Sequence, residues 1–534
     1  MMMRHVYETV VRFLAQAREP ALLEPGEAPI PLHPDTHQID FDERRLVLQA
    51  WDLERNITRR ICGLGAAAPG RLELQVERFG KKRGTLVMVD MAARRGATEL
   101  QRSDRHAFRE RFRKQLLRQF PGWRLAELSA EADLHHSLSP AFPRAMLRKG
   151  TGAWAAIAAP PDSRSPQAAL TFGLIWLDYL RRRDPKVQVA GLALFLPSDR
   201  TMVTAQRLRW LDERQARFAL FACGESGEHL VDLRDCGNLQ TELGTAASGT
   251  FSLPDSLAEK IAALPDVDVA WRGDGVSFRV RGLEFARYAA GQVLFGVDSK
   301  YMASEDRFGE IAGFAQILAA ARHADAANRR HPYFTRCPEL WLESMVREDL
   351  GALDASLRPR ALYGQVPAFA GGDRDVIDLL GVDAEGRLAV LELKASSDPH
   401  LPLQALDYWM RVAWHAERGE FTACGYFPGV ELRREPPRLL LVSPALEFHP
   451  STETIAGFLR PEIELERVGL GIEWQRKLRV VCRARGAASP VWQAGQEFMN
   501  GEEYLGGHPV RALHAKPIGS TGSGGAAGSH RAGS

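Results

Sequence analysis

The stretch Arg374-Asp-Val-Ile-Asp-Leu-Leu-Gly-Val382 decides the fold of the carboxy-terminal third of the chain. It is apolar and partly β-branched, which predicts a core strand, yet it carries acidic residues. The turn Asp383-Ala-Glu-Gly386 leads into a second apolar strand, Arg387-Leu-Ala-Val-Leu-Glu-Leu-Lys-Ala395. Because a buried carboxylate is costly unless it is paired or binds a metal, these two strands indicate a site.

Two carboxylates and one ammonium group come together in this hairpin. Side chains alternate between the faces of a strand, so Glu392 and Lys394 project from the same face. The partner strand brings Asp378 close, with thirteen residues between Asp378 and Glu392. Two neighbouring carboxylates repel each other unless a hard cation lies between them, and oxygen ligands suit Mg²⁺ or Mn²⁺. The sequence therefore predicts a divalent-metal site.

These residues resemble the signature of the PD-(D/E)XK nuclease superfamily, the fold of restriction endonucleases and many repair and recombination nucleases. Downstream, Gln404-Ala-Leu-Asp-Tyr408 is similar to the QxxxY element of the RecB-like branches. Upstream, Pro338-Glu-Leu-Trp-Leu-Glu343 resembles the first helix of that core. The resemblance covers residues 331–485 alone. It implies a mixed sheet flanked by helices, in the order helix 338–350, strands 360–366, 374–382 and 387–395, helix 402–416 and strand 438–442.

The resemblance also implies a role for each matching residue. Asp378 and Glu392 would bind one or two Mg²⁺ (or Mn²⁺) ions, with the backbone carbonyl of Leu393 as a further ligand. Lys394 would position the attacking water, and hydrolysis would leave a 5′-phosphate. The catalytic set would be completed by Glu343, Gln404 and Tyr408.

Three positions leave room for other interpretations. Asp375 lies on the opposite strand face from Asp378, which is preferred because the apolar pair and turn of the family follow it. Ile377 stands where many family members have proline. Glu343 is chosen on the first helix, although Glu339, Glu343 and Arg347 at i, i+4 spacing also suit an ordinary surface ion-pair ladder.

Length and composition predict a multidomain α/β protein. The 534 residues are too many for one core, and 45% hydrophobic with 25% charged residues matches average globular usage. We expect an α/β region of unassigned fold over 1–250, a small linking α+β unit over 257–330, the nuclease-like domain over 331–485, and an extension over 486–534 that is disordered from about 519. No internal repeat is evident in the sequence.

Several classes of protein are disfavoured. The longest apolar stretches fall well short of the ~20 residues of a membrane helix, and the amino terminus lacks the apolar run of a signal peptide. The six cysteines are scattered without a CxxC pair, which favours a reduced, cytoplasmic protein. No GxxxxGK[ST] motif occurs, so a nucleoside triphosphate is not an expected partner.

Basic residues in the amino-terminal part are candidates for phosphate contacts. A loop carries Lys81 and Lys82, and a helix over 104–120 carries Arg109, Arg113 and Lys114 around an apolar row. The net charge is only +2, so a solvated, charge-balanced surface is the alternative for both.

The function expected from the sequence is metal-dependent hydrolysis of phosphodiester bonds. DNA is favoured over RNA, with an endonuclease of defence, repair or recombination as the main hypothesis. The alternative is a non-cleaving nucleic-acid-binding or scaffolding protein built on a nuclease-like fold. A protein partner bound through the amino-terminal region, or a homodimer, is compatible with either.

Overall fold

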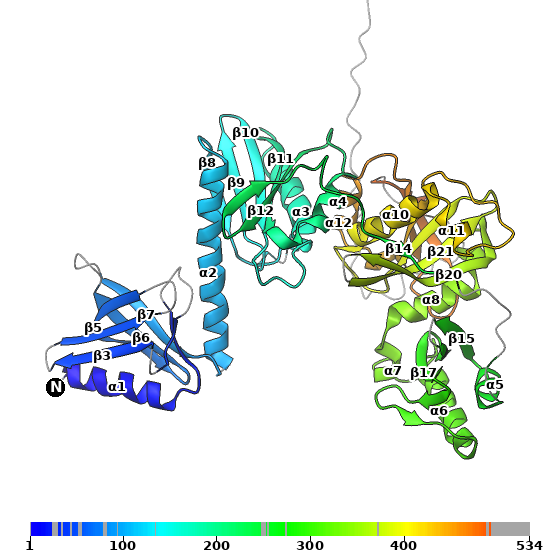
Figure 1. The fold of residues 1–534 in the computed structure, drawn as a ribbon, viewed down its shortest axis with the longest axis horizontal. Helices are drawn as coiled ribbons and strands as arrows, with labels where there is room; N and C mark the ends of the chain where they lie inside the picture. The colour runs from blue at the N-terminus through cyan, green and yellow to red at the C-terminus, as the bar shows by residue number, and fades with distance from the viewer. Residues whose placement is uncertain are drawn as a thin grey trace, which may run out of the picture. The chain divides into compact units, whose positions relative to one another are not determined.

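A computed structural model describes residues 2–23, 30–33, 36–42, 45–51, 56–77, 83–92, 94–133, 135–246, 253, 256–272, 275–370, 373–487 and 491–492. Lys81 and Lys82 of the predicted basic loop lie outside the described residues. Residues 493–534 also lie outside them, and these include the part from about 519 that was predicted to be disordered. The described chain is α/β and multidomain, as predicted, and it contains four sheets (Figure 1). Among these residues, no helix combines the length and apolar character that crossing a bilayer requires.

The first sheet is antiparallel and has the strand order β2-β1-β7-β6-β5-β4-β3. Helix α1 (Met2–Gln16) lies along it (Figure 1) and contributes Val6 and Val10 to a core with Leu46 and Leu74. Strands β6 and β7 pair with each other as an antiparallel hairpin. The strands are β1 (Pro20–Leu23), β2 (Ile30–Pro31), β3 (His37–Asp42), β4 (Arg45–Trp51), β5 (Asn56–Ala68), β6 (Arg71–Glu77) and β7 (Arg83–Asp90).

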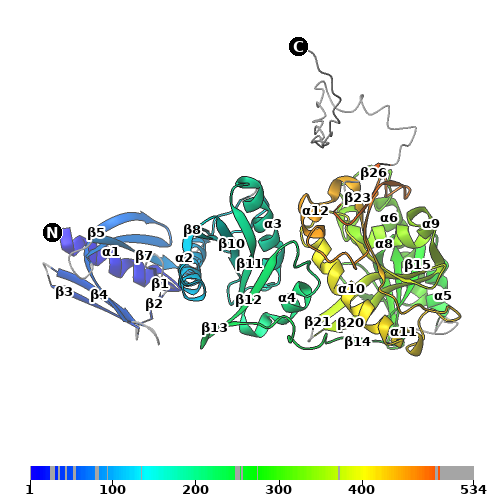
Figure 2. The same ribbon diagram turned by 90° about the horizontal axis from the view of Figure 1, so that it is seen from above.

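The second sheet is mixed and has the order β13-β12-β11-β10-β9-β8. Helix α2 (Arg94–Gln119) covers one face through Phe112 and Leu116, and α3 (Ala168–Arg183) covers the other through Trp176 and Leu177 (Figure 2). Residues 1–250, predicted as one α/β region, thus hold two separate sheets. The other elements are β8 (Arg124–Ser129), β9 (Arg144–Lys149), β10 (Gly152–Ala158), β11 (Gln188–Pro197), η1 (Ser198–Arg200), α4 (Met202–Leu208), β12 (Arg217–Gly224) and β13 (Gly227–Leu230).

The third sheet is an antiparallel meander, β15-β16-β17-β18-β19, in which each strand pairs with its neighbours in sequence. Alternating apolar residues such as Phe278 and Phe285 face Ile311 and Leu318 of α6. These strands and α6 lie within the stretch 257–330, for which a small α+β unit was predicted. The elements are α5 (Ser256–Ala262), β15 (Val267–Arg272), β16 (Gly275–Val280), β17 (Leu283–Ala289), β18 (Gln292–Phe295), β19 (Tyr301–Met302), η2 (Glu305–Arg307) and α6 (Phe308–Ala321).

The fourth sheet is mixed and holds the residues of the predicted site. Its order is β14-β20-β21-β22-β23-β24-β25-β26, and the short edge strand β14 (Glu242–Leu243) comes from an earlier part of the chain. The other strands are β20 (Leu357–Ala370), β21 (Asp373–Asp383), β22 (Leu388–Leu393), β23 (Arg438–Pro444), β24 (Leu465–Leu470), β25 (Val480–Arg485) and β26 (Val491–Trp492).

Helices cover both faces of this sheet. Trp341 and Val346 of α8 pack on one face, and Leu406 and Trp409 of α10 pack on the other. The predicted order of helix, three strands, helix and strand is confirmed. The helices are α7 (Pro332–Thr335), α8 (Pro338–Glu348), α9 (Leu350–Leu353), α10 (Leu401–Glu417), α11 (Glu420–Ala423), η3 (Ala445–Glu447) and α12 (Ser451–Ala456).

The two mixed sheets share one plan. In each sheet, a helix comes first and is followed by three strands that pair antiparallel. A second helix then leads to a fourth strand, which pairs parallel with the third. The fifth strand pairs parallel with the fourth, and the sixth pairs antiparallel with the fifth. The strands are β8 to β13 in one sheet and β20 to β25 in the other. A repeat that the sequence does not display is thus present in the topology.

Candidate active site

Asp378 and Glu392 come together on the adjacent strands β21 and β22. The register pairs Leu379 with Leu391, so the next positions along the two strands are Asp378 and Glu392. Oδ2 of Asp378 accepts a hydrogen bond from the backbone nitrogen of Leu393, at 3.0 Å. The Asp378 carboxylate is therefore held against the end of β22.

The Glu392 carboxyl group is almost entirely buried. Glu392 is 3% exposed, and its Oε2 has no hydrogen-bond partner among the described residues. Burial, followed by the nearby charge of Asp378, raises the pKa of Glu392 well above its ordinary value, while Lys394 opposes the rise. A buried carboxyl oxygen without a hydrogen-bond partner is costly, so this position calls for a functional explanation.

Asp378 is also shifted toward its protonated form. Burial raises its pKa to about 6, the hydrogen bond from Leu393 opposes this, and the charge of Glu343 adds to the rise. The charge of Lys394 lowers the pKa. Burial is thus the main cause that raises the pKa of both carboxyl groups, and the charge of Lys394 offsets only part of the rise.

Lys394 lies directly after β22, at the same end of the strand. Its backbone nitrogen donates to the carbonyl oxygen of Val442, at 3.0 Å, which continues the pairing of β22 with β23. Its Nζ lies 3.7 Å from Oδ2 of Asp398, and the two side chains are 22% and 24% exposed. Asp398 was missed from the sequence, although it stands just before Pro399 and the start of α10, where a polar residue that ends a loop is common.

Helix α10 contributes Gln404 and Tyr408. Oε1 of Gln404 is buried and has no hydrogen-bond partner among the described residues. Tyr408 is half-buried against the core, and the guanidinium of Arg411 lies 5.8 Å from its ring centroid. Both residues belong to a helix that packs on β22, the strand that carries Glu392, and on the neighbouring strand β23.

Glu343 is a buried residue of α8. Its Oε1 accepts a hydrogen bond from Nε of Arg347 at 2.9 Å, which is the i, i+4 pair that the sequence suggested. The pair lies against Gly364 of β20: a Cβ atom there would overlap the Arg347 guanidinium and lie 2.9 Å from Oε1 of Glu343. Glu343 is close enough to Asp378 to raise its pKa.

A second unpredicted pair supports α10 from the other mixed sheet. Arg207 of α4 donates from Nε and Nη2 to the two carboxylate oxygens of Asp407, at 2.9 and 2.7 Å. The two side chains are only 6% and 13% exposed. Asp407 contributes to the raised pKa of Glu392, so this bidentate ion pair lies near the site.

Among the residues predicted to contact phosphates, the described ones, Arg109, Arg113 and Lys114, lie on α2 and not in this cluster of groups. Arg109 and Arg113 of α2 both pair with Glu110, at 3.3 and 2.9 Å, and Lys114 is exposed on the same helix. The positive charge of this helix surface is thus partly neutralised locally.

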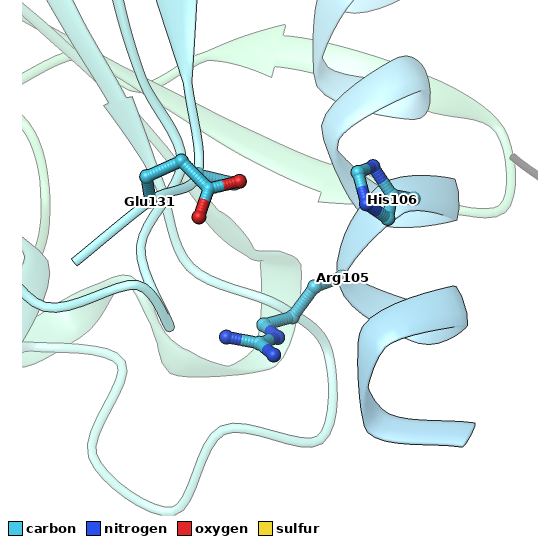
Figure 3. Close-up of a pocket in the computed structure, with 4 residues that line it drawn as sticks. Arg105, His106 and Glu131 are labelled. Atoms are coloured by element: carbon cyan, nitrogen blue, oxygen red, sulfur yellow. The ribbon is translucent and has the colours of Figure 1, made fainter. Parts of the chain in front are cut away.

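Two cavities lie away from the carboxylate cluster. One, of about 90 Å³, is lined by Arg105 and His106 of α2 with Ala130 and Glu131 after β8, and Figure 3 shows Arg105 extending from the helix toward that loop. The other is a charged groove of about 590 Å³ whose lining includes Asp354, Arg387, Arg438 and Glu466. Arg438 pairs with both Asp354 and Glu466. Charged side chains that line this groove thus neutralise one another.

The carboxylate cluster fits a hard divalent cation. Within the described residues, no three His, Cys, Asp or Glu side chains form a metal-binding group, so the side chains alone supply a pair of carboxylates. Asp378 and Glu392 offer oxygen atoms, and Oε2 of Glu392 is the buried acceptor that a cation would satisfy. Oxygen donors of this kind suit Mg²⁺ or Mn²⁺ and not a thiolate-seeking metal.

Asp378→Asn is expected to stabilise the metal-free protein at alkaline pH. The pKa of Asp378 is about 6 in the folded protein and 3.8 in the unfolded chain. The group therefore contributes its full stability to the fold below pH 3.8, and this contribution is lost as the pH rises through about 6. Wild type therefore carries a penalty at pH 8, at most about 2–3 kcal/mol, that asparagine removes while still accepting the Leu393 hydrogen bond.

The measurement is the melting temperature in EDTA at pH 5 and at pH 8. The variant should melt above wild type at pH 8, and the difference should shrink at pH 5. Asp235→Asn, at an exposed aspartate, serves as the control and should change neither value. A variant that melts below wild type at pH 8 would contradict the proposed penalty for ionising Asp378 in the folded protein.

The chain was also compared with known proteins. No protein-family model matches it, and no curated protein is detectably similar to it in sequence.

Proposed function

We propose that the protein is a divalent-metal-dependent nuclease that hydrolyses phosphodiester bonds in nucleic acid, with DNA favoured over RNA. The observation that carries this proposal is the buried Glu392 carboxylate, whose Oε2 has no partner among the described residues, next to Asp378 and Lys394. This combination of two carboxylates and one ammonium group at the end of a strand pair matches the sequence signature described above.

Asp378, Glu392 and the backbone carbonyl of Leu393 would hold the ion. When bound, Mg²⁺ supplies positive charge that polarises a phosphoryl oxygen and lowers the pKa of water. The raised pKa values of the two carboxyl groups mean that protons compete with the ion at acidic pH. Nuclease activity should therefore decline as the pH falls toward 6.

Lys394 would act on the attacking water. Its ammonium group stays near Asp398, which limits its conformations, and it is accessible enough to meet a substrate. An ammonium there orients the water and offsets the negative charge that develops on the phosphoryl oxygens. Gln404 and Tyr408 of α10, the helix that packs on β22 and β23, would steady the scissile phosphate.

The protein should cleave nucleic acid only with a suitable divalent cation. The experiment incubates the full-length chain with labelled single- and double-stranded DNA and RNA in Mg²⁺, Mn²⁺, Ca²⁺ or EDTA. We expect cleavage with Mg²⁺ or Mn²⁺, loss in EDTA and poor support by Ca²⁺, because calcium prefers more ligands at longer distances. Cleavage that continues in EDTA would exclude the proposed chemistry.

A scaffolding or purely binding function would give a different result. Such a protein would cleave none of the substrates with any cation. Isothermal titration of Mg²⁺ or Mn²⁺ into wild type and into Asp378→Asn separates the two cases without any turnover, since only the intact carboxylate pair should bind the ion.

A further inference from the structure

The two mixed sheets correspond strand by strand, including irregular details. We name the elements α2 to β13 the first copy and α8 to β25 the second copy. Pro197 and Pro444 end the equivalent strands β11 and β23 with nearly the same backbone angles, φ −53° and ψ 137° in one, φ −51° and ψ 134° in the other. A short 3₁₀ helix, η1 or η3, begins at the next residue in each case, and a short α-helix follows it.

The correspondence identifies the position of the site in the first copy. The backbone nitrogen of Ala159 donates to the carbonyl oxygen of Phe195, as that of Lys394 donates to Val442. Ala159 therefore stands at the position of Lys394, and Ile157, two residues earlier, stands at that of Glu392.

The position of Asp378 follows from the neighbouring strand. Ile157 pairs with Arg144 on β9, and Glu392 lies opposite Asp378 on β21. Arg144 therefore stands at the position of Asp378. Arg144 is buried, donates from Nη1 to the carbonyl oxygen of Glu131 at 2.9 Å, and lies 5.5 Å from the ring centroid of Trp176. A buried arginine with an isoleucine and an alanine cannot hold a divalent cation, so the first copy has the fold without the site.

The two copies contact each other reciprocally. Residues Trp210 to Asp212 follow α4, and Phe458 to Arg460 follow α12, at equivalent places. The nitrogen of Asp212 donates to the oxygen of Phe458 at 2.8 Å, and the nitrogen of Arg460 donates to the oxygen of Trp210 at 2.9 Å. Leu211 forms an antiparallel bridge with its own equivalent, Leu459. Exchanging the copies converts one of these bonds into the other, which is the property of a two-fold interface.

The helices beside these segments also form reciprocal contacts between equivalent elements of the two copies. In one direction α4 of the first copy meets α10 of the second through Arg207 and Asp407, at 2.7 Å. In the other direction α12 of the second copy meets α3 of the first through Thr454 and Asp178, at 3.4 Å. One continuous apolar core contains buried residues of both copies, among them Leu211 and Leu459. The copies are therefore packed together as the halves of a dimer are.

We infer that this chain is an internal pseudodimer with one equipped site, and that it acts on duplex nucleic acid by cutting one strand of the two. The inference rests on the proposed nuclease function. The two antiparallel strands of a duplex are related by local two-fold axes, so a protein with two-fold symmetry matches a duplex and not a single strand. Only the second copy has the carboxylate pair, so one encounter breaks one backbone.

The reaction is a hydrolysis that needs no further reactant. The oxygen of water forms a bond to phosphorus, and the bond from phosphorus to the 3′ oxygen breaks. One proton of the water goes to the leaving oxygen. The products are a 3′-hydroxyl and a 5′-phosphate on one strand, and the complementary strand remains continuous.

Supercoiled circular DNA tests this inference. With the full-length protein and Mg²⁺, we expect the supercoiled form to be converted into nicked open circles, at a rate that is first order in protein. Linear molecules should appear only after a lag, when independent nicks on opposite strands coincide. A duplex oligonucleotide labelled on both strands should be cut in either strand but not in both during one encounter.

Different failures have different meanings. Linear DNA formed without a lag, or with a rate that is second order in protein, would overturn the single-strand cut while leaving the nuclease function intact. Preference for single-stranded circles over duplex circles would overturn the duplex substrate. Absence of cleavage in all nucleic acids would overturn the inference together with the proposed function. Glu392→Gln is the control for contaminating nicking activity and should leave the supercoiled form unchanged.

Discussion

Glu392→Gln is expected to lower kcat/KM for phosphodiester hydrolysis on the order of 10³-fold. Glutamine has nearly the same shape as glutamate and can occupy the same buried place beside β22. It lacks the charge that holds a divalent cation, and catalysis needs the complete set of groups. Because the buried carboxyl group of Glu392 has a raised pKa, its loss should leave the melting temperature of the metal-free protein equal to or above that of wild type.

The measurement compares initial cleavage rates and melting temperatures of the same preparations. Glu462→Gln, at an exposed glutamate in the same domain, is the matched control and should keep wild-type activity. Lys394→Ala and Asp378→Ala should lose activity to a similar degree. Full activity of Glu392→Gln would show that cleavage, if present, arises elsewhere in the molecule.

Arg207→Ala should destabilise the protein by roughly 3–5 kcal/mol, because it leaves the nearly buried carboxylate of Asp407 without its partner. The change is made in the first copy, but Asp407 belongs to α10 of the second. The unpaired charge lies near Glu392 and disfavours its ionisation, so binding of Mg²⁺ should weaken as well.

Thermal melting and titration of Mg²⁺ measure the two effects. Arg182→Ala removes an exposed i, i+4 ion pair with Asp178 and should cost less than about 1 kcal/mol. The double variant Arg207→Ala/Asp407→Ala should recover part of the stability, since neither charge then remains buried alone. If Arg207→Ala melts with wild type, the pair does not hold the two copies together.

The second copy was largely predictable from the sequence because its signals are local. The apolar strands of β21 and β22 flank a turn, and Asp378, Glu392 and Lys394 interrupt them with charges that require an explanation. The family resemblance of residues 331–485 placed α8 and α10 within a few residues of their observed bounds. Hydrophobic periodicity and charged residues in core strands are both properties of short stretches of chain.

The first copy was not recognised because it has lost the residues that make the second recognisable. Arg144, Ile157 and Ala159 replace the charged set, and what remains in β9 to β11 is an apolar pattern that any buried sheet shares. The contact of Arg207 with Asp407 joins residues about 200 positions apart, and single-sequence reasoning has no means of pairing such distant residues. Asp398 and Asp407 became candidates only because the structure places them beside Lys394 and Arg207.

The bridge between Leu211 and Leu459 sets the order in which the nascent chain can fold. About 250 residues separate its two sides, so at ribosomal speed the first copy waits on the order of 10 to 50 s for its partner. The meander β15 to β19 lies between them and pairs only neighbouring strands, so it can complete its fold during this interval. Meanwhile apolar side chains of α3 and α4 that belong to the shared core, such as Leu177 and Leu208, await the second copy.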